Sequence, residues 1–173
     1  AAGGRILLTY NCQKARLKSI KRIPTPLSKS TSQSNTSSSP PAHQRWLIII
    51  NPTAGNGKTQ KLWPRIESLL QQHGYSYSVQ FTHKKGHATQ LAEDFILKGF
   101  RQILAIGGDG TNNEVINGIL NQDTTESNNI SYTLFPIGTG NDWVKTHGIS
   151  RKLETFVERL KKGKVKYQDV GLV

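Results

Sequence analysis

The sequence predicts an α/β protein with a Rossmann-like layered fold, in which helices flank a mostly parallel sheet. Two observations carry this prediction. From residue 46 onward, short apolar runs alternate with stretches whose apolar residues have helical spacing, and this alternation is typical of parallel strands joined by helices. The runs 46–50 and 102–106 are apolar throughout, as is usual for strands that are buried on both faces.

Each element follows from a local pattern. Apolar residues recur on one helical face in four stretches, 58–73, 86–98, 111–121 and 151–162. Apolar runs or alternating patterns predict strands at 46–50, 75–82, 102–107, 131–138 and 164–173. The chain of 173 residues therefore has enough elements for one domain of ordinary size.

The first 44 residues differ in composition from the rest. They hold seven of the 23 Lys and Arg residues and no acid, so about +5 of the +12 net charge remains for 45–173. Residues 24–44 are rich in Ser, Thr and Pro and bury too little apolar surface to offset the entropy of ordering. We therefore expect 1–44 to be a disordered basic tail. A targeting or membrane-surface role and a tail without a role both stay open.

Composition excludes several classes of protein. The single cysteine, Cys12, excludes an internal disulfide framework, and no apolar run reaches the 18 residues that a membrane-spanning helix needs. No recognised nucleic-acid motif accompanies the basic charge, so no nucleic-acid partner is expected. The sequence has no methionine, which suggests a processed product or a fragment.

Glycine-rich stretches follow three of the predicted strands. They are NPTAGNGK at 51–58, GGDGTNNE at 107–114 and GTGND at 138–142. Ligands of open α/β sheets bind outside the carboxyl ends of the strands, and parallel strands end at one edge. We therefore expect the three loops to open on one edge of the sheet.

The stretch at 107–111 is the most informative. Gly107, Gly108 and Gly110 leave room for phosphate oxygens to approach the backbone, and the helix that begins there directs free N–H groups toward an anion. Asp109 is unfavourable beside phosphate unless Mg²⁺ or a proton to be removed accompanies it. Thr111 can cap the helix or donate to phosphate. The alternative is a tight turn in which Asp109 only caps the helix.

The stretch at 51–58 resembles a P-loop at its end only. Gly57–Thr59 match the last residues of that motif, but its first glycine would fall at Pro52, which has no N–H to offer. We therefore reject a P-loop. Asn51 can bond the opposite loop or a nucleotide, and Gly55 lets the backbone approach phosphate. Lys58 either supplies charge or is a solvated lysine.

Further polar residues lie at the same predicted edge. Gly138, Thr139 and Asn141 form a turn with donors, or an ordinary strand-to-helix turn with a cap. Thr82 ends a strand and can reach a nucleotide. Glu114 either faces the site or interacts with the helix dipole.

One histidine at this edge, His87, has no partner that the sequence reveals. We read it as a residue that starts a helix and not as a base.

Together, INPTAGNGK, THKKGHATQLA, GGDGTNNEVINGI and PIGTGNDW make residues 45–173 resemble the catalytic domain of the diacylglycerol kinase and sphingosine kinase superfamily, the bacterial lipid kinases above all. In this family the Asn-Pro-x-x-Gly loop is the normal form. The resemblance implies ATP- and Mg²⁺-dependent phosphorylation of a lipid hydroxyl, with threonine at 111 typical of the diacylglycerol branch. It assigns Asn51, Thr82, the 107–111 loop and Thr139 to the nucleotide, and Asp109 to the Mg²⁺–phosphate arrangement.

The resemblance also implies a cytoplasmic protein with peripheral membrane contact and a possible homodimer. Members of the family look like two-domain proteins, whereas this sequence stops at DVGLV, 169–173. We therefore expect a nucleotide-binding half that lacks a β-rich C-terminal domain with the lipid pocket. Three other readings stay open: an NAD kinase, a non-catalytic nucleotide-binding regulatory module and a nucleic-acid-binding protein.

Overall fold

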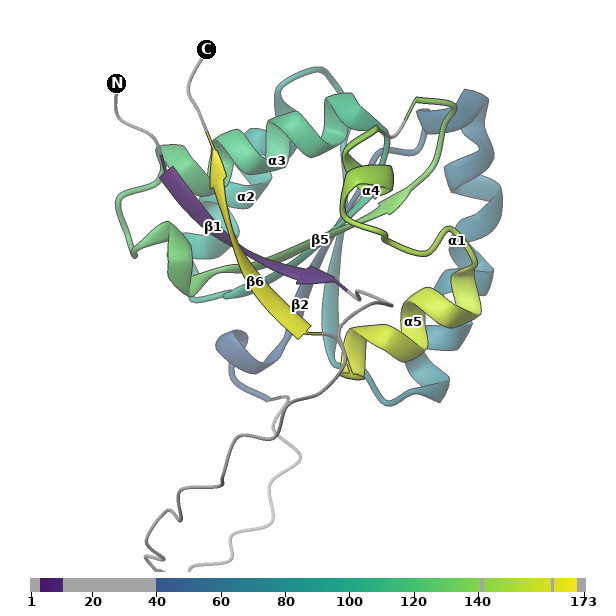
Figure 1. Ribbon diagram of the computed structural model, residues 1–173, viewed down its shortest axis with the longest axis horizontal. Coiled ribbons are helices and arrows are strands. Elements are labelled where there is room, and N and C mark those ends of the chain that lie inside the picture. Colours follow the sequence, from purple (N-terminus) through teal and green to yellow (C-terminus); the bar gives the residue numbers. More distant parts are fainter. Residues whose placement is uncertain (1–3, 11–39, 141, 163, 171–173) are drawn as a thin grey trace, which may run out of the picture.

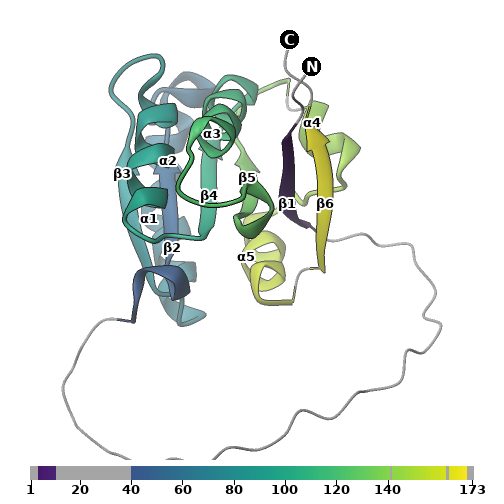
Figure 2. The ribbon, with the colours of Figure 1, turned by 90° about the vertical axis from the view of Figure 1, so that its left-hand side faces the viewer.

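The structure, a computed structural model, describes residues 4–10, 40–140, 142–162 and 164–170. Six strands form one sheet in the order β3-β2-β4-β5-β1-β6, which Figure 2 shows side by side. Their bounds are β1 Gly4–Tyr10, β2 Trp46–Ile50, β3 Tyr77–Phe81, β4 Gln102–Gly107, β5 Ser131–Pro136 and β6 Lys164–Val170. All neighbouring pairs are parallel except β1 and β6, which are antiparallel. The predicted mostly parallel sheet is confirmed.

Helices cover both faces of this sheet. Their bounds are α1 Ala54–Gln72, α2 His87–Leu97, α3 Asp109–Asn121, α4 Asp142–Thr146 and α5 Leu153–Lys162. The chain moves one way in the sheet from β2 to β3 and the other way from β3 to β4, so right-handed crossovers put α1 and α2 on opposite faces. Figure 1 shows α2 beside α3, and α5 near α1. The predicted helix-flanked α/β fold is thus confirmed.

The central strands are buried as their sequences predict. All five residues of β2 are buried, as are residues 103–107 of β4 and residues 132–136 of β5. The predicted strands begin and end within three residues of the observed ones over the described residues. Residues 171–173, included in the last predicted strand, lie outside the part that the structure describes.

The expected disordered tail is wrong for residues 4–10. They form β1, which pairs with β5 on one side and with β6 on the other. Ile6 in this strand is fully buried, so its aliphatic side chain contributes to the core. A short 3₁₀ helix also forms at Ala42–Gln44. The expectation for residues 11–39 concerns a segment outside the described residues.

The starts of α1 and α3 and the presence of α4 can be compared with the sequence prediction. α1 is assigned from Ala54, but Gly55, Asn56 and Gly57 have left-handed backbone angles, so the regular helix begins at Lys58 as predicted. α3 begins at Asp109, two residues earlier than predicted. The short helix α4 was not predicted, because five residues are too few for an apolar period to show.

A buried pair of polar side chains joins β5 to α3. The Tyr132 hydroxyl donates to Asn112 Oδ1 at 2.7 Å, and the two side chains are 0% and 7% exposed. We expect Tyr132→Phe to lower the free energy of unfolding by about 1–3 kcal/mol, because it leaves a buried amide oxygen without its donor. Urea denaturation measures this. Tyr77→Phe is the control, since among the described residues the Tyr77 hydroxyl makes only the long hydrogen bonds of 3.3 and 3.5 Å, and Tyr77 is partly exposed.

The same pair predicts a dependence on alkaline pH. Burial raises the pKa of Tyr132 well above its usual value. Above about pH 10 the unfolded chain therefore releases a phenolic proton that the folded chain keeps, so stability is lost as the pH rises. Tyr132→Phe should remove this part of the alkaline loss, and an unchanged alkaline slope would contradict the assignment.

Candidate functional site

The carboxyl ends of four neighbouring strands lie level with one another. The N–H of Thr82, after β3, donates to Ile50 O at 2.8 Å, and the N–H of Asn51, after β2, donates to Ile106 O at 3.0 Å. The N–H of Ile137, after β5, donates to Gly107 O at 2.8 Å. The ladder therefore extends just past the strands and aligns the loops that follow them. The predicted meeting of the Gly-rich loops at one edge is confirmed.

The turn after β2 is held by left-handed residues and by one asparagine. Gly55, Asn56 and Gly57 have φ values of 61°, 58° and 76°, a conformation that glycine and asparagine tolerate best. A Cβ on Gly55 would lie 2.8 Å from Ile137 Cγ2, so the turn packs directly on the loop after β5. This turn takes the place of a P-loop, as the presence of Pro52 predicts.

Asn51 links the turn to the loop after β4. Its Nδ2 donates to Thr111 Oγ1 at 3.2 Å, and its Oδ1 accepts the N–H and the hydroxyl of Thr53 at 3.1 and 2.8 Å. Of the two roles foreseen for Asn51, the bond to the opposite loop is confirmed. Thr111 is 5% exposed, so this link forms the floor between the two loops.

The three glycines of the 107–110 stretch lack a side chain for different structural reasons. A Cβ on Gly107 would meet the Thr111 side chain at 2.4–3.1 Å, and one on Gly108 would lie 3.4 Å from Ile137 O. A Cβ on Gly110 would have no described neighbour within 4 Å. Room for an external ligand is therefore found at Gly110, whereas at Gly107 the missing side chain makes room for Thr111. The expectation that all three glycines leave space for phosphate is corrected in this respect.

Neither Asp109 nor Thr111 is the cap of α3. The N-cap is Gly108, which has an extended backbone and no side-chain cap hydrogen bond, and Asp109 is the first helical residue. Asp109 Oδ2 lies 2.7 Å from the place where a Cβ of Gly140 would be, so the carboxylate sits against the turn after β5. The two capping alternatives left open by the sequence are therefore wrong.

A cavity of about 410 Å³, here called the first pocket, opens between the loops after β3, β2 and β4. Five of the expected site residues line it: Asn51, Thr82, Gly110, Thr111 and Glu114. Thr53 and the basic loop His83–Lys85 complete the polar part of the lining. The pocket thus combines hydroxyl, amide and carboxylate groups with two lysines.

Glu114 has a structural partner as well as a place in this pocket. Its Oε2 accepts the backbone N–H of Ala88 at 3.1 Å, so it satisfies one of the free donors at the start of α2. The Thr89 hydroxyl donates to Glu114 O at 2.9 Å. Two roles were left open by the sequence, facing the site and a charge on the dipole of its own helix. The structure shows Glu114 at the first pocket, with a cap on the neighbouring helix α2 in addition.

His87 holds the basic loop in place. Its Nδ1 accepts the N–H of His83 at 3.1 Å, and the two imidazole rings stack with centroids 5.3 Å apart. His87 is the first residue of α2, as the sequence predicts. Through this bond it fixes the segment that carries Lys84 and Lys85 over the first pocket.

A second cavity of about 490 Å³, the second pocket, lies on the other side of the turn after β2. The remaining expected residues that line a cavity are found here: Gly55, Lys58, Gly138 and Thr139. Arg151 joins them and donates from Nη2 to Gly138 O at 2.9 Å. Leu62, Phe135 and Ile137 give this pocket an apolar wall.

The expected nucleotide residues are thus divided between two pockets. Gly107 and Gly108 lie in the loop between them and line neither. Asn141 lies outside the described residues. Its neighbour Asp142 accepts a hydrogen bond from Lys145 Nζ at 2.7 Å, and this bond holds the pKa of the Asp142 carboxyl below its ordinary value.

No preformed metal cluster accompanies Asp109. Within the described part of the chain, no three His, Cys, Asp or Glu side chains come close enough to hold a metal ion. A single carboxylate such as Asp109 fits Mg²⁺ only when phosphate oxygens supply further ligands. The residues present therefore suit an ion that arrives with a nucleotide.

Neither the basic loop His83–Lys85 nor Arg151 was predicted from the sequence as part of the site. Lys84 and Lys85 follow a strand at the same sheet edge as the glycine-rich loops, so the strand-end rule could have found them. Arg151 follows α4, far along the chain from Gly138, and no local pattern marks it. Over the described residues, no helix is both long enough and apolar enough to cross a membrane.

Comparison with known proteins gives a consistent family. The profile of the diacylglycerol kinase catalytic domain matches residues 45–173. The chain is 38% identical over 109 residues to a diacylglycerol kinase of Bacillus subtilis, which covers 63% of this chain and 35% of that protein. It is 31% identical over 128 residues to a diacylglycerol kinase of Staphylococcus saprophyticus, which covers 74% of this chain and 41% of that protein.

A solved structure agrees with these relatives. A diacylglycerol kinase from Bacillus anthracis superposes with a TM-score of 0.59 at 26% identity, over 69% of this chain and 40% of that one. The matched part is therefore well under half of each of these relatives, 35–41% of the two sequences. With a family match that spans 45–173, the chain belongs to the diacylglycerol kinase catalytic domain family.

Proposed function

We propose that this chain is the nucleotide-binding part of an ATP-dependent lipid kinase that phosphorylates diacylglycerol or a related lipid. The observation that carries the proposal is the position of Asp109, on the loop between two pockets at one sheet edge. One pocket can hold the donor nucleotide, and the phosphoryl group can pass Asp109 toward an acceptor on the other side. The names of the relatives support a lipid acceptor.

In this proposal, the first pocket takes the nucleoside part of ATP. Asn51, Thr82 and Thr111 supply amide and hydroxyl groups, and Lys84 and Lys85 offset the negative charge of phosphates. Backbone N–H groups at the start of α3 face the phosphate chain, with the open space at Gly110 for close approach. Gly138 and Thr139 lie where the chain of phosphates would end.

The chemical step is a phosphoryl transfer. The acceptor oxygen forms a bond to the γ-phosphorus, the bond from that phosphorus to the β,γ-bridging oxygen breaks, ADP leaves and the hydroxyl proton goes to solvent. When bound, Mg²⁺ neutralises charge on the phosphates, and Asp109 orients that arrangement. The protein mainly positions groups, which suits loops held by the bonds of Asn51 and Glu114.

Calorimetric titration of this chain tests the proposal with Mg-ATP, ATP with EDTA, and NAD. We expect Mg-ATP to bind, and Asp109→Asn to weaken its binding about tenfold while ATP with EDTA is little affected, because the charge that orients Mg²⁺ is lost. Asp123→Asn is the matched control, since Asp123 is exposed and lines neither of the two pockets.

Other outcomes would change the assignment. Binding of NAD in preference to Mg-ATP would favour the NAD kinase reading. If Asp109→Asn leaves the affinity for Mg-ATP unchanged, Asp109 has no part in nucleotide binding. Nucleotide binding with no transfer to any lipid, even in a chain as long as the relatives, would favour a regulatory module. Peripheral contact with a membrane surface is part of the proposal, because the acceptor is a lipid.

A further inference from the structure

The second pocket combines unneutralised positive charge with an apolar wall. Its described lining holds two cations, Lys58 and Arg151, and no carboxylate. Both side chains are exposed, and neither forms a salt bridge with any carboxylate of the described residues. Nearby Arg65, in contrast, is paired with Glu154. The pocket therefore has positive charge that the described protein leaves unneutralised.

Arg151 is held with its charged group at the pocket. One Nη2 donates to Gly138 O at 2.9 Å, and this is its only hydrogen bond among the described residues. A guanidinium group has five N–H donors, so most of them stay available to an oxyanion. The bond to Gly138 limits the freedom of the side chain and so lowers the entropy that a ligand must remove.

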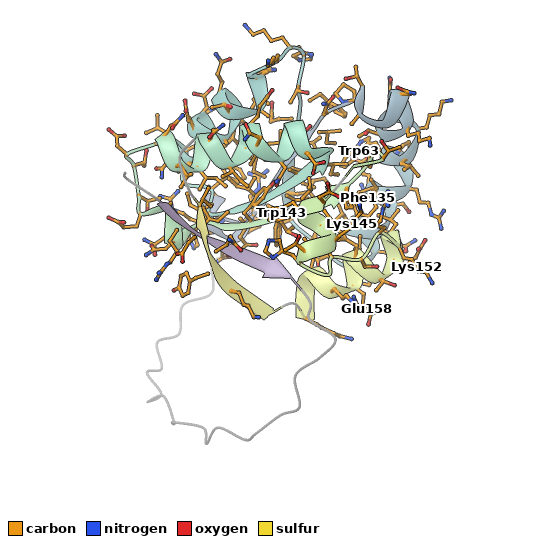
Figure 3. The ribbon with its side chains drawn as sticks, turned by 45° about the horizontal axis from the view of Figure 1, so that its top comes forward. Trp63, Phe135, Trp143, Lys145, Lys152 and Glu158 are labelled. Atoms are coloured by element: carbon orange, nitrogen blue, oxygen red, sulfur yellow. The ribbon has the colours of Figure 1, made fainter. Side chains whose placement is uncertain are left out.

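Asn56 and Thr139 add polar groups to this pocket, and one wall of it is apolar. Phe135 and Ile137 are 4% and 5% exposed and form its base, and Leu62 is 36% exposed at its side. Figure 3 labels Phe135, and it shows Lys152 and Glu158 projecting outward at the α5 end of the molecule. A site with cations at its mouth and an apolar wall suits a ligand that has both an anionic group and an apolar body.

We infer that the second pocket binds the acceptor, and that this acceptor is a lipid with an anionic phosphate-type head group and a free hydroxyl. The inference rests on the proposed function, and it replaces the role of Lys58 as a nucleotide contact. Thr139 lines the pocket, and Asp109 Oδ2 lies 2.7 Å from the place where a Cβ of the next residue, Gly140, would be, so a hydroxyl on such a head group would be near the transferred phosphoryl group.

Calorimetry with small probes tests this inference on the chain itself. The probes are monomeric dihexanoyl phosphatidylglycerol, which has a phosphodiester and free hydroxyls, neutral dihexanoylglycerol, and inorganic phosphate. We expect the anionic lipid to bind at least tenfold more tightly than either of the other two. Lys58→Gln and Arg151→Gln should each weaken it about tenfold, and Leu62→Ser should weaken the lipid but not phosphate.

Matched controls lie next to each cation. Lys61→Gln and Lys152→Gln remove exposed charges that line neither pocket, and both should leave lipid binding unchanged. Each variant is also titrated with Mg-ATP. Lys58→Gln and Arg151→Gln should keep Mg-ATP affinity within about twofold, and thermal melting checks that every variant is folded.

The outcomes separate this inference from the proposed function. Equal affinity for the neutral and the anionic lipid would contradict the inference that the acceptor has an anionic head group. Loss of Mg-ATP binding in Lys58→Gln and Arg151→Gln would show that the second pocket binds the phosphates of the nucleotide. Displacement of the lipid by phosphate and Mg-ATP at equal affinity would show the same. If Mg-ATP does not bind the unmodified chain at all, the proposed function fails, whatever the lipids do.

Discussion

Gly118→Ala is expected to destabilise the protein, although a change from glycine to alanine in an exposed helix usually stabilises that helix. Alanine is favoured over glycine inside a helix by about 1 kcal/mol. At Gly118 of α3, however, the added Cβ would lie 2.5 Å from Thr89 O and 2.7 Å from Ala92 Cβ, both on α2. A carbonyl oxygen and a Cβ cannot move away by a change of rotamer, so the two helices must separate.

The cost of the close contact exceeds the gain in helix propensity, because α2 is held against α3 at this point. The Thr89 hydroxyl donates to Glu114 O at 2.9 Å, one turn before Gly118, and Ala92 is fully buried. Overpacking of such an interface costs about 1–3 kcal/mol, to which loss of the hydrogen bond adds about 1 kcal/mol. We therefore expect a net loss of about 2 kcal/mol in the free energy of unfolding, measured by urea denaturation.

The control for this change is on the same helix. Asn113 is exposed, and its only described side-chain contact is the 3.0 Å bond from Asn117. Asn113→Ala should stay within about 0.5 kcal/mol of the unmodified chain. If Gly118→Ala proves as stable as that control, or more stable, the helices are free to separate and the contact does not explain the glycine.

The sequence predicted the fold well where the pattern is local and long. Buried strands such as 46–50 carry an apolar run that no helix of that length would have, and helix 111–121 shows its period over three turns. β1 was not predicted, because its seven residues are ordered by pairing with β6, about 160 positions away in the chain. Such pairing cannot be read from the local stretch GRILLTY, although that stretch carries the apolar residues Ile6, Leu7 and Leu8 and only one charge, Arg5.

The position of the site was predictable from the sequence, but the division of its residues between two pockets was not. The rule for strand ends brings Asn51, Thr82 and Thr111 together, and the structure confirms that they line one pocket. The same rule cannot tell that Lys58 and Thr139 face a different pocket, because the division arises from the left-handed turn at 55–57 and its contact with Ile137. These contacts depend on packing between loops.

Gly107→Ala is expected to damage both the fold and nucleotide binding. The added Cβ would lie 2.4 Å from Thr111 Oγ1 and 2.8 Å from Thr111 Cβ. Since Thr111 Cβ is fixed to the backbone of α3, the start of that helix must shift. The shift breaks the 3.2 Å bond from Asn51 and moves the N–H groups proposed to bind phosphate. We expect stability to fall by about 1–3 kcal/mol and the thermal stabilisation by Mg-ATP to be lost.

Gly110→Ala distinguishes the two uses of glycine in this loop. A Cβ there meets no described atom within 4 Å, so stability should stay within about 0.5 kcal/mol of the unmodified chain. Gly110 lines the first pocket, however, and the new methyl group would occupy space proposed for phosphate oxygens, so Mg-ATP should bind at least tenfold more weakly. Gly110→Ala with full Mg-ATP affinity would show that the phosphates pass elsewhere. Gly107→Ala with unchanged stability would show that Thr111 can move, and that the loop is less rigid than its packing implies.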